Sequence, residues 1–246
     1  MASRFDYNPL RQAGLEWGAC DVQSASRRNS LRAQSGSVSN KVLLAIVGLL
    51  LAAFAGWLLL KYLESSRVSQ AIEALNGTTA AVFAYQDRYG RTPGDDGPAA
   101  SLAARGSLWS SVTAGDVDGR LDVGINQLFT GNGESAPFWQ QLRAAGFWSG
   151  DPAVTGPEAL PQNPWGGLVS VLADEMGGGL SGNKVCMSQV PGTAAAAIDS
   201  EMDDGDGASG RLRATQGSRD ANTNPSNSSL EEPFSENLVY TICYRM

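Results

Sequence analysis

Two short acidic segments of the chain hold the residue types that could bind a metal ion. Residues 115–122 place aspartates at alternate positions beside a glycine, as calcium-binding loops do, and residues 203–207 form a second acidic segment with glycines. A complete calcium loop also needs a bidentate carboxylate at a fixed offset, for which Glu134 is a distant candidate in the first segment. Each segment is therefore predicted to be either a calcium site or a plain acidic turn. The candidate ligands are Asp116, Asp118, Asp122, Asp203, Asp204 and Asp206.

Covalent catalysis has few candidate residues in this chain. There is no histidine among the 246 residues, which removes the usual general base and the commonest metal ligand. No Gly-x-Ser-x-Gly motif marks a nucleophile, and what remains is a set of scattered carboxylates such as Asp95 and Asp96. We therefore expect a protein that is not an enzyme.

Two of the three cysteines lie in segments with the pattern of β-strands. Residues 184–187 and 238–244 are rich in apolar and β-branched residues. If these strands pair, Cys186 and Cys243 lie opposite each other and close a loop of about 58 residues, which is worth roughly 4 kcal/mol in the chain-entropy treatment. The alternative is two free thiols. Cys20 stands apart from both, which suits a chain divided between a reducing and an oxidising compartment.

One long helix is expected to position the rest of the chain. Residues 42–60 carry no charge and are almost all apolar, which is close to the roughly 20 residues that cross a bilayer. No proline or glycine pair interrupts the chain until the Pro93-Gly94 turn, so the helix is predicted to continue to about Gly90 as an amphipathic helix. The apolar or small residues that recur at helical spacing there are Val68, Ile72, Leu75, Thr79, Val82 and Phe83.

The distribution of charge predicts how the chain is oriented in a membrane. Residues 1–41 hold six basic and three acidic residues and carry a charge of +3, whereas the whole chain carries −7, which leaves −10 for the remainder. By the positive-inside rule the first segment stays in the cytoplasm and the acidic part is exported. An acidic domain repels phosphate, so we expect no nucleic-acid partner.

Several segments, in order along the chain, resemble the type IV pilins and the pseudopilins of type II secretion. Together they cover most of residues 66–246. The matching segments are residues 67–69, 80–82, 85–90, 93–95, 138–146, 163–167, 197–205 and 240–245.

This resemblance implies an α+β fold in which a long N-terminal helix packs on a small antiparallel sheet. The implied segments are 1–36, a leader or cytoplasmic tail; 37–63, the transmembrane half of the helix; 64–90, its amphipathic half; and 91–246, an exported globular domain. The implied function is that of a structural subunit, a minor pilin or pseudopilin, of a type IV pilus or a type II secretion-type filament.

The resemblance also implies a location and a set of partners. The subunit would sit in the lipid of the bacterial inner membrane with its domain in the periplasm, and would be extracellular once assembled. Its partners would be other pilin-like subunits, bound through the N-terminal helix, together with a prepilin peptidase and an inner-membrane assembly platform. The alternative is a single-span membrane-anchored extracytoplasmic binding or sensor module that keeps the pilin-like fold and never polymerises.

The N-terminal region departs from the family pattern. The resemblance places the peptidase cleavage site between Gly36 and Ser37, but Ser37 stands where the family has an apolar first residue. Lys41 stands near the position of the family's glutamate, which pairs with the N-terminal amine of a neighbouring subunit, and a lysine cannot form that pair. These departures favour a specialised tip, initiating or non-assembling subunit over a main shaft subunit.

Overall fold

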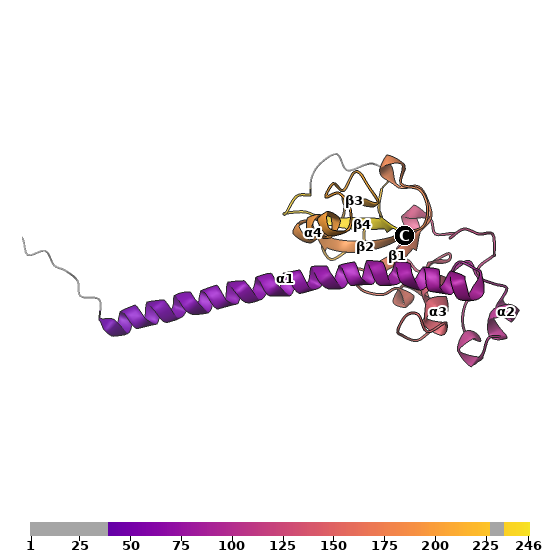
Figure 1. Ribbon diagram of the computed structural model, residues 1–246, viewed down its shortest axis with the longest axis horizontal. Coiled ribbons are helices and arrows are strands. Elements are labelled where there is room, and N and C mark those ends of the chain that lie inside the picture. The colour runs from indigo at the N-terminus through magenta and orange to yellow at the C-terminus, as the bar shows by residue number, and fades with distance from the viewer. Residues whose placement is uncertain (1–38, 227–233) are drawn as a thin grey trace, which may run out of the picture. The chain divides into compact units, whose positions relative to one another are not determined.

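The computed structural model describes residues 39–226 and 234–246 (Figure 1). The chain divides into two units, Met1–Leu49 and Leu50–Met246, and the boundary falls inside the long helix α1, Asn40–Tyr89. The predicted cleavage residues Gly36 and Ser37 lie outside the described residues. Lys41 lies in the first turn of α1 and is exposed.

The second half of α1 contributes one stripe of side chains to the core of the larger unit. Its buried residues follow a helical spacing of three and four, because only one face of the helix meets the domain. The predicted stripe is confirmed at Ile72, Leu75 and Val82, but Phe83 is 59% exposed, so its prediction as a stripe residue was wrong. Phe83 follows Val82 directly, and one residue rotates the side chain about 100° around the helix, away from the domain. The buried residues are Ala71, Ile72, Leu75, Thr78, Ala81, Val82 and Tyr85.

A four-stranded antiparallel sheet forms the other layer of the domain. Its order is β1-β2-β4-β3, where β1 is Val169–Leu172, β2 is Lys184–Pro191, β3 is Leu212–Gln216 and β4 is Val239–Arg245. The predicted pairing of the two cysteine-bearing segments is confirmed, since β2 and β4 are neighbours. Strand β3 falls outside the predicted strands. Its side chains are buried from Leu212 to Thr215 without the polar and apolar alternation that marks a half-exposed strand.

In the described part of the larger unit, three shorter α-helices and four 3-10 turns complete the fold. Helix α4, Gly192–Met202, contacts β2, β3 and β4, and helix α3, Ser135–Ala144, contacts β1. Helix α2 is Ala99–Ala103. One apolar core joins α1, α3, α4 and the sheet, and Phe138 and Trp139 of α3 are fully buried in it. The predicted α+β class, with a long N-terminal helix and a small antiparallel sheet, is therefore confirmed. The 3-10 turns are Ser107–Trp109, Ile125–Gln127, Gly156–Ala159 and Gly177–Gly179.

Candidate functional site

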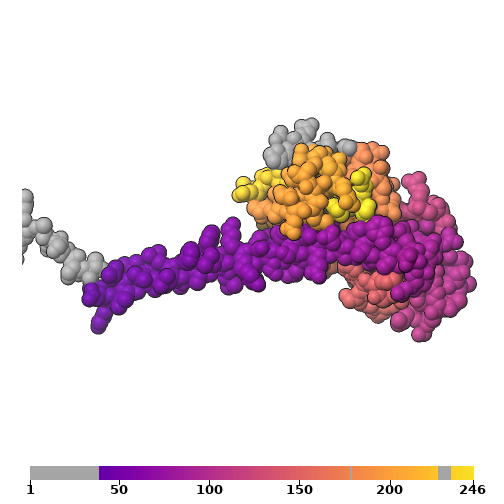
Figure 2. Space-filling view, in the orientation of Figure 1, coloured from indigo at the N-terminus to yellow at the C-terminus, as the bar shows by residue number. Residues whose placement is uncertain are grey.

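The apolar half of α1 exposes a long run of large apolar side chains. Its large side chains are exposed throughout, including Leu49, which is 72% exposed, and Leu60, which is 68% exposed. Its most apolar window has a mean hydropathy of 2.7, and none of that window is buried (Figure 2). Within the part of the chain that the structure describes, this is the one helix long and apolar enough to cross a membrane.

A buried polar network holds the loop that follows α1. The Tyr85 hydroxyl donates to Oδ2 of Asp96 at 2.6 Å, and the Arg105 guanidinium donates to the same oxygen at 2.7 Å. Burial raises the pKa of the Tyr85 hydroxyl, and the neighbouring Asp96 carboxylate raises it further. Gln141 of α3 closes the network by accepting the Gly94 N–H at 2.6 Å and donating to the Asp96 carbonyl. The network fixes the exit of α1 against α3.

The first acidic segment forms a group with Asp95, a residue outside the predicted ligand set. Carboxylate oxygens of Asp95, Asp116 and Asp118 lie within 4.8 Å of one another, whereas Asp122 is exposed and outside this group. The buried Asp95 accepts the N–H groups of Asp118 and Gly119, both at 3.0 Å. Burial raises the pKa of Asp95 despite these hydrogen bonds.

Glu134, the distant candidate, is the N-cap residue of α3, and its carboxylate binds backbone groups of the same loop. Its Oε1 accepts the Asp116 N–H at 3.3 Å and its Oε2 accepts the Asp122 N–H at 2.9 Å. Burial raises its pKa as well. Both buried carboxylates of this loop, Asp95 and Glu134, therefore have backbone partners that hold the chain in its turn.

The second acidic segment forms a group with Asp199, which belongs to the last turn of α4. Oxygens of Asp199, Asp203 and Asp204 lie within 4.8 Å of one another, and Asp206 is outside the group. Burial raises the pKa of Asp199 to about 7, and the Asp203 and Asp204 carboxylates add to this, while the nearby Gly205 N–H acts in the opposite direction. Asp199 lies in α4 and Asp203 is the C-cap residue just beyond it, so the end of the helix brings the two carboxylates together.

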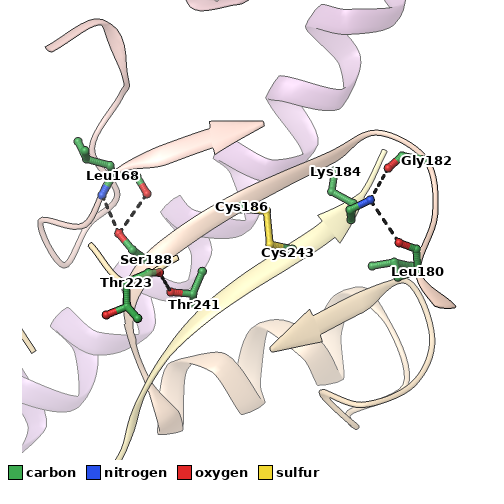
Figure 3. The surroundings of a disulfide bond; sticks show 9 residues. All are labelled: Leu168, Leu180, Gly182, Lys184, Cys186, Ser188, Thr223, Thr241 and Cys243. Carbon is green, nitrogen blue, oxygen red and sulfur yellow. Dashed lines mark hydrogen bonds between the residues drawn. A yellow bond between two sulfur atoms is a disulfide. The ribbon is translucent and has the colours of Figure 1, made fainter. Parts of the chain in front are cut away.

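The Cys186–Cys243 disulfide is confirmed, and it joins directly opposite positions of β2 and β4. Both cysteines are fully buried. Figure 3 shows the bond between two polar residues of β2. On one side Lys184 donates to the carbonyls of Leu180 and Gly182, and on the other side the Ser188 hydroxyl accepts the Leu168 N–H. The bond therefore ties the two central strands of the sheet.

A groove of about 330 Å³ lies between α1 and α4, close to the end of the apolar segment. Lys61, Glu64 and Val68 line it from α1, and Ala194 and Glu201 line it from α4. The residues of this groove combine small, apolar and charged side chains and form no catalytic constellation.

Taken together, these features define a class: an α+β protein with one helix able to cross a bilayer and a disulfide-bonded domain built on the second half of that helix. No family model, no curated protein and no solved structure matches the chain.

Proposed function

We propose that the chain is a structural, non-enzymatic subunit of pilin-like type, held in the bacterial inner membrane by α1 and able to join a type IV pilus or a type II secretion-type filament. One observation carries the proposal. A single unbroken helix, Asn40–Tyr89, is exposed and apolar in its first half and is built into the core of a small domain in its second half.

The exposed apolar half of α1 would hold the subunit in the membrane before assembly and would bind it to other subunits in a filament. In the bilayer its leucines contact lipid, and in a filament they would contact equivalent helices of other subunits. Gly48 and Gly56 support such packing, because a methyl group built at either position meets no atom of this chain within 4 Å. Their small size is therefore not required by the chain itself, and it would allow close approach of a second helix.

The charges and the disulfide support one orientation. The basic residues 1–41 would remain in the cytoplasm, and the acidic domain would lie in the periplasm. A disulfide between Cys186 and Cys243 suits this oxidising compartment, whereas a cytosolic protein seldom keeps one.

A second candidate function rests on Lys41. This lysine is exposed in the first turn of α1, near the position where the family that the chain resembles has an acid. A subunit without that acid lacks the partner for a neighbouring N-terminal amine. Lys41 therefore favours a membrane-anchored binding or sensor module that does not polymerise.

Intact mass and N-terminal sequencing of the protein from its own host's membranes test the two candidates. A chain that begins at Ser37 and co-purifies with other pilin-like subunits is the expected result, and Gly36→Glu should leave residues 1–36 attached. A chain that keeps residues 1–36 and purifies alone would overturn the assembling subunit in favour of the anchored module.

A further inference from the structure

The carboxylate of Asp199 is buried at the C-terminal end of α4. The residue has no solvent-exposed surface, and neither of its side-chain oxygens has a hydrogen-bond partner among the described residues. The Gly205 N–H lies nearby without meeting the geometry of a hydrogen bond. A carboxylate removed from water is costly unless a charge or hydrogen bonds compensate it or a proton neutralises it, and a bound cation would supply that charge.

Asp203 and Asp204 bring two more carboxylates to the same point, and their own contacts hold them there. Oδ2 of Asp203 accepts the N–H groups of Arg211 and Leu212, which join the end of α4 to the start of β3. Asp204 accepts the Asp206 N–H through Oδ1 and the Ser209 hydroxyl through Oδ2. The cluster is therefore positioned before any ligand arrives.

Among the described residues, no basic side chain forms an ion pair with these three carboxylates. In the described ranges the ion pairs are Glu64–Arg67 and Asp96–Arg105, both elsewhere. Arg213 acts on Asp204 through its charge, while its guanidinium N–H groups donate to three backbone carbonyls. The guanidinium of Arg211 donates to the carbonyl of Arg245. The cluster also lies at the C-terminal end of α4, where the helix dipole is negative and no basic residue occupies the last turn.

We propose that Asp199, Asp203 and Asp204 bind one divalent cation, and that Ca²⁺ is the ion of choice. Hard carboxylate oxygens are the ligands that Ca²⁺ prefers, and at about 2.3–2.6 Å from the ion two such ligands can be up to about 5 Å apart. The spacing of the three oxygens, within 4.8 Å, lies inside that limit. Bound there, the ion neutralises the buried Asp199 and fastens α4 to β3.

The loop of Asp95, Asp116 and Asp118 provides the internal comparison. It has the same number of grouped carboxylates, yet its buried member already accepts N–H groups from Asp118 and Gly119. We therefore assign the ion to the cluster at α4 alone.

The test is Ca²⁺ titration of the full chain in detergent micelles at pH 7.5, after removal of metal with a chelator, followed by calorimetry and by thermal unfolding. The variants are Asp199→Asn and Asp204→Asn, and the matched controls are Asp206→Asn in the same loop and Asp116→Asn in the other cluster. Asp204 is exposed, so its variant remains informative if Asp199→Asn does not fold.

The expected result is one Ca²⁺ per chain, with a rise of several degrees in Tm in the wild type and in both controls. Each ligand variant should weaken Ca²⁺ binding at least about tenfold, since affinity in such sites follows the number of charged ligands. The proposal would be overturned if millimolar Ca²⁺ changed neither the Tm nor the calorimetric heat of the wild type. Loss of Ca²⁺ binding in Asp116→Asn would also overturn it. An Asp199→Asn chain that is more stable than a Ca²⁺-insensitive wild type would show that Asp199 is a protonated structural acid.

Discussion

The Tyr85 hydroxyl and the Asp96 carboxylate form a buried hydrogen bond of 2.6 Å that joins the last turns of α1 to the loop that follows it. Arg105 donates to the same carboxylate oxygen and stacks over the Tyr89 ring at 4.3 Å. The exit of the long helix is thus held by a charged network rather than by apolar contact alone.

Removing either partner should destabilise the domain, and by different amounts. Tyr85→Phe leaves Asp96 paired with Arg105 and should lower the free energy of unfolding by about 1–2 kcal/mol. Asp96→Asn leaves Arg105 partly buried without its counter-ion and should lower it by about 2–4 kcal/mol. Denaturant unfolding measures both, with the exposed Asp87→Asn as the control. Equal stability of Asp96→Asn and wild type would show that the network is not structural.

The disulfide should stabilise the domain only in its oxidised form. Closure of the long loop between Cys186 and Cys243 restricts the unfolded chain, so the double variant Cys186→Ala/Cys243→Ala should lose about 2–5 kcal/mol under oxidising conditions. Reductant should lower the Tm of the wild type and leave that of the double variant unchanged. Cys20→Ser, which removes the third thiol, should respond to reductant as the wild type does.

Lys184 should make stability rise with pH in the alkaline range. Burial lowers its pKa from 10.5 to about 8, with Arg245 adding to this and Asp174 and Glu175 opposing it. Between these values the unfolded chain binds the proton that the folded chain has released, so the free energy of unfolding increases with pH.

The gain from Lys184 should be on the order of 2 kcal/mol between pH 8 and 10. Denaturant unfolding in a Cys20→Ser background measures it, and Lys184→Met should remove the slope. Above pH 10 the folded chain keeps the Tyr85 proton that the unfolded chain releases, because the pKa of Tyr85 is raised. The free energy of unfolding then decreases with pH, so the rise due to Lys184 is expected only up to about pH 10. A slope that survives in Lys184→Met would assign the effect to other groups.

A single charge in the apolar half of α1 should release the chain from membranes. Leu51 lies near the middle of the apolar segment and is 63% exposed. An arginine there costs roughly 2.5–3.5 kcal/mol of insertion free energy, so Leu51→Arg should increase the fraction extracted from membranes by alkaline carbonate. Leu51→Ile keeps the apolar character and should remain in the membrane fraction. If both variants behave alike, the segment does not reside in lipid.

Short-range patterns were sufficient for the long helix and for the two cysteine strands. The helix is predictable because an unbroken apolar run followed by a period of three and four specifies both its length and its buried face. The pairing of Cys186 with Cys243 is predictable because each cysteine lies in a recognisable strand. Strand β3 was not predicted, because Arg213 and Thr215 are buried within the sheet and break the polar and apolar alternation that marks a strand.

The acidic segments show what tertiary structure alone decided. Their glycines and aspartates predicted two turns, but the spacing could not distinguish Asp206, which lies outside its group, from Asp199, which lies inside it. Asp199 is buried because α4 packs on the sheet, and Asp95 joins Asp116 because the loop after α1 folds back. Burial and long-range proximity determine which carboxylates lack a partner, and both depend on contacts between segments far apart in the chain.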